Sequence, residues 1–199
     1  LLLVYSPLAH MVWGGGFLSD GGLFGPQGVR DFAGGLVVHL TAGVAALLIA
    51  VVIGRRMDTT APAHNPGMVM IGAAMLWVGW YGFNGASGLA ADANAARTIA
   101  ATHLAAAAAS ITWVAWEFWK FGRFTLVGMV TGTIAGLASV TPASGFVGPT
   151  YALFIGFVAG ILCQEAVHLL KNKLKVDDSL DVFAVHAVGG GFGSVMLAA

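Results

Sequence analysis

Five apolar runs, each about as long as a bilayer is thick, are the feature that most constrains the fold of this chain. The complete runs cover residues 32–53, 67–86, 98–119, 124–147 and 151–170, and partial runs cover 1–13 and 182–199. A helix needs roughly 20 apolar residues to cross the hydrocarbon core of a membrane. Because each complete run reaches that length, the sequence predicts an all-α polytopic membrane protein.

The composition argues against a soluble domain. The chain is 58% hydrophobic and 9% charged, whereas soluble domains carry about 25% charged residues. Its formal net charge is zero, so no basic surface suggests a nucleic-acid partner. The single cysteine, Cys163, excludes an internal disulfide and a metal site built from cysteines.

Lysine and arginine predict the orientation in the membrane. If the runs alternate in direction, seven of the nine basic residues fall on one side. The larger group comprises Arg55, Arg56, Lys120, Arg123, Lys171, Lys173 and Lys175, and the smaller group comprises Arg30 and Arg97. The positive-inside rule makes the larger group cytoplasmic. Asp31 is then expected near the outer face and Asp181 near the inner face.

Glycines recur at four-residue spacing in the later runs, at 128, 132 and 136, at 156 and 160, and at 189 and 193. This spacing lets helix backbones approach closely within a membrane. The run 189–193 is not a phosphate-binding loop, because it lacks the lysine and the preceding strand. We therefore expect these glycines to lie at helix–helix contacts.

Two histidines lie deep inside apolar runs, and each follows an aspartate. Asp31 precedes His39, and Asp181 precedes His186. An imidazole is costly in hydrocarbon and usually faces a partner or a pathway. The two phrases cross the membrane in opposite directions, as in a transporter with inverted halves. This predicts one intramembrane site built from both histidines, and a simple bond from each histidine to a neighbouring helix is the alternative.

A metal site is the rival chemistry for the histidine pair. Zinc requires three or four ligands, and no further His or Cys occupies a matching position in the sequence. We therefore expect no metal.

The predicted depths of the two histidines in the membrane are inconsistent with direct contact between their rings. At a rise of about 1.5 Å per residue, His39 lies roughly 10 Å inside its run and His186 about 6 Å inside its own. A hydrocarbon core of about 30 Å would leave a gap between them. Either the run boundaries are misplaced, or residues 177–181 dip below the membrane surface into a cavity. We favour the dip, because Asp181 is less costly in a wet vestibule.

Six short phrases occur in an order and spacing that closely resemble the ammonium transporter (Amt/MEP/Rh) family, on its bacterial Amt side. The phrases are HMVWGGG at 10–16, DFAGG at 31–35, GWYGFN at 79–84, TPASG at 141–145, VDD at 176–178 and DVFAVH at 181–186. The resemblance implies an eleven-helix, inverted-repeat fold that forms homotrimers. Residues 1–199 would be a partial ammonium transporter domain, truncated at both termini. It would run from the end of the fourth helix through most of the tenth.

The resemblance also implies roles for individual residues. His39 and His186 match the paired pore histidines, which relay protons. Trp13, Phe83 and Ser87 match the outer vestibule that receives ammonium, and Trp80 matches the pore entrance. Asp31 and Asp181 are expected to act structurally and electrostatically. Two alternatives remain open: Asp31 as a helix N-cap and Trp13 as an interfacial anchor. Where many relatives have glycine after the second histidine, this chain has Ala187, which is expected to alter only local packing.

The function implied by the resemblance is ammonium transport across the plasma membrane, the bacterial inner membrane, by a protein that is not an enzyme and needs no cofactor. Ammonium would be gathered outside and conducted as ammonia past the histidines. A PII-type regulator at the cytoplasmic mouth is the further partner implied. The alternatives are an ammonium sensor with a fused cytoplasmic domain and a Rh-like gas channel. Trp13 and the phrase at 31–35 favour the Amt side.

Overall fold

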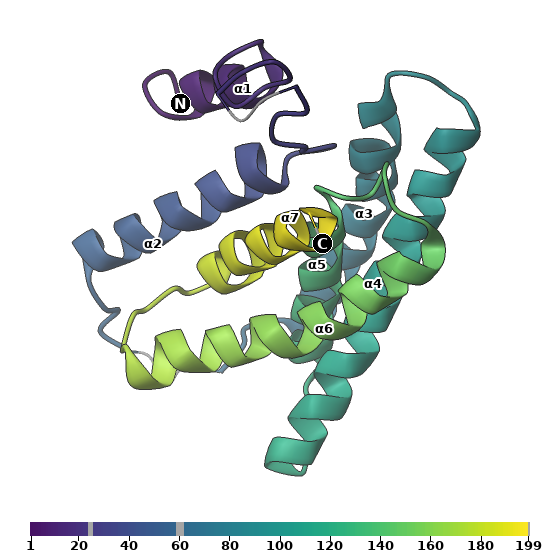
Figure 1. The fold of residues 1–199 in the computed structure, drawn as a ribbon. Helices are drawn as coiled ribbons and strands as arrows, with labels where there is room; N and C mark the ends of the chain where they lie inside the picture. The colour runs from purple at the N-terminus through teal and green to yellow at the C-terminus, as the bar shows by residue number, and fades with distance from the viewer. Residues whose placement is uncertain (24–25, 59–61, 199) are drawn as a thin grey trace.

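The computed structural model describes residues 1–23, 26–58 and 62–198, and its regular elements are helices (Figure 1). The α-helices are α1 (Tyr5–Trp13), α2 (Thr41–Ile53), α3 (Pro66–Gly85), α4 (Ala93–Phe121), α5 (Leu126–Val140), α6 (Pro149–His168) and α7 (Gly189–Ala198). Four shorter helical segments adjoin them. These are the π-helices η1 (Gly35–Leu40), η3 (Leu169–Lys173) and η4 (Phe183–Val188), and the 3₁₀ turn η2 (Ala86–Gly88).

Four helical segments within the described residues are long and apolar enough to cross a membrane. They are Gly35–Ile53, Pro66–Gly88, Ala93–Phe121 and Pro149–Lys173. The prediction of an all-α polytopic membrane protein is confirmed. The partial run at 182–199 contains η4 and α7, and its last residue lies outside the described residues.

Polar caps account for where α3, α4 and α5 begin. The side chains of Asn65, Asp92 and Thr125 each accept a hydrogen bond from an amide in the first turn, at 2.9–3.0 Å. Such caps satisfy amides that have no partner within the helix. The cap at Asp92 also explains why α4 begins five residues before the run predicted at 98–119.

The predicted span 124–147, the fourth of the complete runs, is wrong at its C-terminal end. Helix α5 ends at Val140 and is 15 residues long, about 22 Å. Pro142 follows almost at once, and proline cannot continue a helix because its ring clashes with the preceding turn and it lacks an amide hydrogen. The Pro142 carbonyl instead accepts from the amide of Phe32, 3.0 Å away, which ties the end of α5 to the segment before η1.

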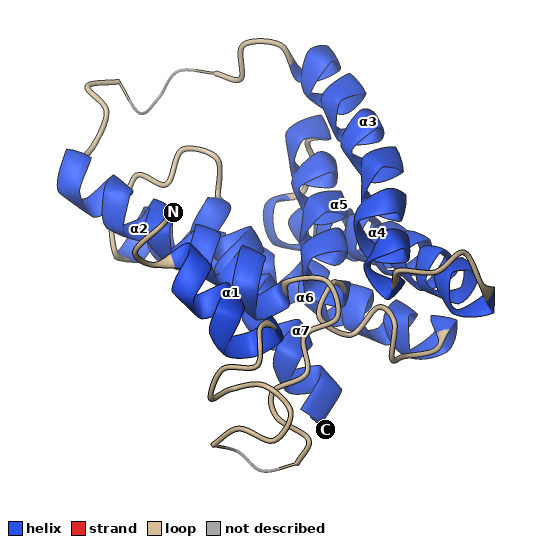
Figure 2. Ribbon diagram, turned by 90° about the horizontal axis from the view of Figure 1, so that it is seen from above, coloured by secondary structure: helices blue, strands red, loops and turns tan. Residues whose placement is uncertain are grey.

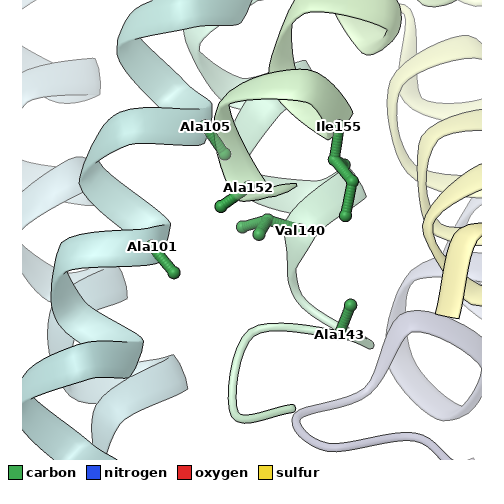
Figure 3. Packing of buried hydrophobic residues seen from close by; sticks show 6 residues of the cluster. All are labelled: Ala101, Ala105, Val140, Ala143, Ala152 and Ile155. Carbon is green, nitrogen blue, oxygen red and sulfur yellow. The ribbon is translucent and has the colours of Figure 1, made fainter. Parts of the chain in front are cut away.

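The core of the fold lies between α4, α5 and α6. Figure 3 shows its small side chains, all fully buried: Ala101, Ala105, Val140, Ala143, Ala152 and Ile155. A Cβ on Gly136 or on Gly156 would run into the carbonyl oxygen of Ala105. These two glycines therefore lie at close helix contacts, as their spacing predicted.

The segments η1–α2 and η4–α7 lie against each other (Figures 1 and 2). A Cβ on Gly43 would fall 2.5 Å from the backbone nitrogen of Ala187, and one on Gly190 would fall 2.6 Å from the carbonyl oxygen of Gly35. Each glycine stands four residues after the histidine of its own segment and contacts the opposite segment. The two histidine-bearing segments therefore cross at a pair of backbone contacts.

Candidate functional site

The structure brings the two predicted histidines into contact. His39 comes from η1 and His186 from η4, and their Nδ1 atoms are 3.2 Å apart, with ring centroids separated by 5.1 Å. The gap expected from the run boundaries is therefore absent. Both rings lie in π-helical turns, a feature often found at functional sites.

The contact uses the Nδ1 atom of His39 and leaves the other nitrogen of that ring, Nε2, available inside the protein. In a bond between two neutral imidazoles, one Nδ1 donates a proton and the other accepts it. The Nε2 atom of His39 is buried, and the described residues provide no hydrogen-bond partner for it. This nitrogen is an acceptor in one tautomer of His39 and a donor in the other. It can therefore bind a small polar molecule in either state.

Two aromatic rings from α3 cover His39. The Trp80 ring stacks on the imidazole with centroids 5.3 Å apart, and the Phe83 ring stacks on it at 6.0 Å. Trp80 is buried, and its Nε1 donates to the hydroxyl of Thr141 at 3.0 Å. The orientation of Trp80 is therefore held by the residue that directly follows α5, while Phe83 remains 40% exposed.

Asp31 caps the helix that carries His39. Its carboxylate is buried and accepts hydrogen bonds of 2.6–3.0 Å from four successive backbone amides. These amides belong to Gly34, Gly35, Leu36 and Val37. This bonding corresponds to the N-cap interpretation and uses both carboxylate oxygens.

Trp13 lies beside the segment that Asp31 caps, and Ser87 lies beside Phe83. The indole Nε1 of Trp13 donates to the backbone oxygen of Asp31 at 2.7 Å, while the residue stays 48% exposed. The Ser87 hydroxyl donates to the carbonyl of Phe83 at 2.7 Å. Because its proton is used in this way, the Ser87 oxygen can act as an acceptor toward another donor.

The counterpart of Asp31 in the second segment is Asp178, and our pairing of Asp31 with Asp181 was wrong. Asp178 precedes His186 by the same eight residues that separate Asp31 from His39. It is 4% exposed, and its Oδ2 accepts from the amide of Phe183 at 2.7 Å. The equal spacing of eight residues is present in the sequence, whereas Asp181 precedes His186 by five.

Asp181 corresponds to Gly34. Each stands three residues after its capping aspartate, and each has a positive φ, 114° for Gly34 and 58° for Asp181. Glycine adopts this conformation freely, and aspartate is among the few other residues that tolerate the left-handed region. The carboxylate of Asp181 forms an ion pair with Lys171 at 2.6 Å. The side chain of Asp181 therefore connects the residues before η4 to η3 and does not cap a helix.

A cavity of about 680 Å³ reaches His186 from the side of Asp181. Its walls include Ile134 of α5 and Val69 of α3. Ser179, Leu180 and Asp181 line this cavity, while the depth of the segment below the membrane surface stays a prediction. Within the described residues, no group of three or more His, Cys, Asp or Glu side chains could hold a metal ion.

Comparisons with known proteins agree on one family. A family model described as Ammonium Transporter Family matches residues 1–199. The ammonium transporter of Bacillus subtilis is 44% identical over 194 residues, which cover 97% of this chain and 46% of the relative. The crystal structure of Saccharomyces cerevisiae Mep2 superimposes with a TM-score of 0.86 at 39% identity, covering 98% of this chain and 45% of that one. A structure titled Sensor Amt Protein gives a TM-score of 0.89 at 33% identity, covering 98% of this chain and 51% of that one. The chain spans about half the length of the curated relatives it matches.

Proposed function

Because the chain belongs to the Ammonium Transporter Family, we propose that this multi-pass membrane protein transports ammonium across the plasma membrane. The observation that carries the proposal is the contact between His39 and His186, two facing imidazoles inside helices that are otherwise apolar.

The physical problem of such a transporter is selectivity against potassium, an ion similar to ammonium in size and charge. An apolar passage rejects bare cations, because the cost of removing their water is not repaid. Ammonium differs because it can lose a proton and enter as neutral ammonia. The passage then needs polar groups that bind ammonia and accept a proton, and imidazoles have both properties.

We assign the recruitment of ammonium to Trp13, which is half-exposed, and to Ser87. An indole face attracts a cation by about 0.5–2 kcal/mol. The Ser87 oxygen, whose own proton is directed to Phe83, can accept a hydrogen bond from ammonium. Asp31 contributes a negative charge behind this position while its oxygens hold the helix start.

Passage is assigned to the region where Phe83 and Trp80 stack on His39. Ammonia that enters beneath Phe83 meets the unpartnered Nε2 of His39. The hydrogen bond between the imidazoles offers a route by which a proton can move from His39 to His186. From His186, both species reach the inner cavity.

Sensing is the second candidate function, and the likeness to Sensor Amt Protein at a TM-score of 0.89 favours it. A sensor would bind ammonium at the same residues and signal through a cytoplasmic domain. We further propose a homotrimer in the bacterial inner membrane and, on the cytoplasmic side, a PII-type regulator. Both assembly proposals derive from the family.

The test uses the full-length protein in lipid vesicles, with ammonium and potassium fluxes measured in parallel. We expect ammonium flux and no potassium flux in the parent, and loss of ammonium flux in His186→Ala. The matched control is His103→Ala, which removes an imidazole from helix α4, away from the pair. Undiminished flux in His186→Ala would contradict the relay. Ammonium binding without flux in the parent would favour the sensor.

A further inference from the structure

Residues 141–145, the phrase TPASG, form a turn that directly follows α5 and is buried throughout. We call it the α5 turn. The amide of Ala143 donates to the carbonyl of Val140 at 3.0 Å, and the amide of Phe146 donates to the carbonyl of Ala143 at 2.8 Å. Figure 3 shows Ala143 in this turn and Val140 at the end of α5. Because the turn is buried, its residue types reflect the groups that they contact.

The α5 turn contacts the segment that leads into the helix of His39. The carbonyl of Pro142 accepts from the amide of Phe32 at 3.0 Å. A Cβ on Gly35 would collide with the ring of Pro142. Likewise, a Cβ on Gly145 would collide with the ring of Phe32. These contacts leave little room for movement between the turn and the start of η1, so the position of the turn helps to determine where His39 lies.

The first residue of the α5 turn contacts Trp80, whose ring stacks on His39. Thr141 is fully buried, and its hydroxyl donates to the carbonyl of Leu137 at 2.7 Å. Because its proton is used in this way, the Thr141 oxygen acts as an acceptor, and Nε1 of Trp80 donates to it at 3.0 Å. Loss of this oxygen would leave the indole N–H without its buried acceptor, which is unfavourable.

The direction of the indole N–H determines what Trp80 presents to His39. An indole donates in the plane of its ring, whereas a stacked ring presents its face. The ring planes of Trp80 and His39 are 27° apart, and their centroids are 5.3 Å apart. Thr141 therefore holds the indole with its polar edge toward the α5 turn and its face toward the imidazole. An indole that turned away from Thr141 would bring its N–H toward the region where the unpartnered Nε2 of His39 lies.

We propose that Thr141 is a positioning residue for the passage of ammonia, that it acts through Trp80, and that the α5 turn sets the gap between Trp80 and His39. This inference rests on the proposed transport function. One turn holds both walls of the gap, because Thr141 bonds the indole from α3 and Pro142 bonds and packs against the segment that leads into η1. Ammonia that enters beneath Phe83 then meets one indole face and one imidazole. An indole free to turn would add a second polar group that retains ammonia or water and slows passage.

The experiment measures ammonium uptake by the full-length protein in lipid vesicles across a concentration series, with rates expressed per folded protein. Thr141→Val keeps the shape of the side chain and removes the hydroxyl. We expect its maximal rate to fall about two- to tenfold, the effect of one lost buried hydrogen bond, while half-saturation is unchanged because Trp13 and Ser87 are intact. Thr141→Ser keeps the hydroxyl and should restore most of the rate. The matched control is Thr133→Val, which removes a buried hydroxyl on α5 that bonds Met129 of the same helix.

A double-mutant cycle tests whether Thr141 acts through the indole. Trp80→Phe keeps an aromatic ring at the position that covers His39 and removes the N–H that needs an acceptor. In the Trp80→Phe background, Thr141→Val should therefore change the maximal rate by less than about twofold. Equal losses from Thr141→Val in the parent and in the Trp80→Phe background would overturn the proposal, because Thr141 would then act independently of Trp80.

The magnetic resonance signal of the Trp80 indole N–H gives a readout that does not depend on transport. Isotope-labelled tryptophan and comparison with Trp80→Phe assign this signal in the full-length protein. We expect it to shift, and its proton to exchange faster with water, in Thr141→Val and not in Thr133→Val. An unchanged signal in Thr141→Val, or a maximal rate equal to that of the parent, overturns the proposal. A parent without ammonium flux would instead contradict the proposed function, and the indole signal would still test whether Thr141 holds Trp80.

Discussion

The outer segment 31–40 and the inner segment 178–188 are built from the same parts in the same order. Each begins with a buried capping aspartate, places a residue with positive φ three positions later, and carries a histidine in a π-helix eight positions after the aspartate. The two segments differ in the number of hydrogen bonds that the capping aspartate accepts. Asp31 binds four amides, whereas the side chain of Asp178 binds one among the described residues. The outer helix start is therefore held by more hydrogen bonds than the inner one.

The surroundings of the two histidines also differ, and His39 is more enclosed than His186. Two aromatic rings stack on His39, and its exposed fraction is 3%. His186 borders the cavity of about 680 Å³. A site assembled from two similar segments can thus have one sheltered imidazole and one accessible imidazole. Under the proposed transport function, this asymmetry would exclude water and cations at the outer end and release ammonia at the inner end.

The largest effect should come from removing the cap of the outer segment. Asp31→Ala leaves four amides without an acceptor, three of them buried. We expect a loss of about 2–4 kcal/mol, more than an ordinary helix cap contributes. The thermal midpoint of the full-length protein, followed by size-exclusion chromatography after heating, should fall markedly, and ammonium uptake should be lost. Asp31→Asn separates structure from charge, because it keeps one acceptor and loses the charge. We expect it to assemble but transport poorly, and normal transport would show that Asp31 is only a cap.

Asp178→Ala tests whether the inner cap is the weaker counterpart. One amide loses its acceptor, so the expected cost is about 1 kcal/mol. The thermal midpoint should fall less than in Asp31→Ala, while uptake is reduced because the start of the His186 helix is less restrained. The same heating series provides the comparison. A loss as large as that of Asp31→Ala would mean that the number of hydrogen bonds does not determine the difference between the segments.

Trp13→Leu should affect the outer entrance without affecting the histidine pair. Loss of the aromatic face removes about 1 kcal/mol of attraction for a cation, which corresponds to several-fold in half-saturation. Uptake of methylammonium across a concentration series should therefore fall at low concentration and recover near saturation. An unchanged half-saturation would identify Trp13 as an interfacial anchor that also bonds Asp31.

The smallest effect is expected for Asp181→Gly, which gives the inner segment the residue type that the outer segment has at Gly34. Glycine accepts the positive φ without strain, which offsets the lost ion pair with Lys171. We expect the thermal midpoint to change little. The reciprocal variant Gly34→Asp serves as the contrast, since a Cβ there would collide with the side chain of Val38. A Gly34→Asp variant as stable as Asp181→Gly would contradict the expected collision with Val38.

Several features of the site followed from the sequence because they depend on local chemistry. The apolar runs predicted the helices, and the rarity of histidine in such runs singled out His39 and His186. Gly136 and Gly156 predicted close packing because only the absence of a side chain permits it. The place of Asp31 before a helix start made an N-cap one of the interpretations that the sequence left open.

The sequence by itself determined which segments are helical and which polar residues are too costly to lie in hydrocarbon without a partner. Only the tertiary structure decided that the imidazoles meet at 3.2 Å and that the side chain of Asp178 accepts the amide of Phe183 at the start of η4. The physical reason is that depth in a membrane follows from how helices cross and where π-turns and loops shift them. Such crossings are determined by contacts between residues far apart in the chain, such as Gly43 with Ala187, and local periodicity does not encode them.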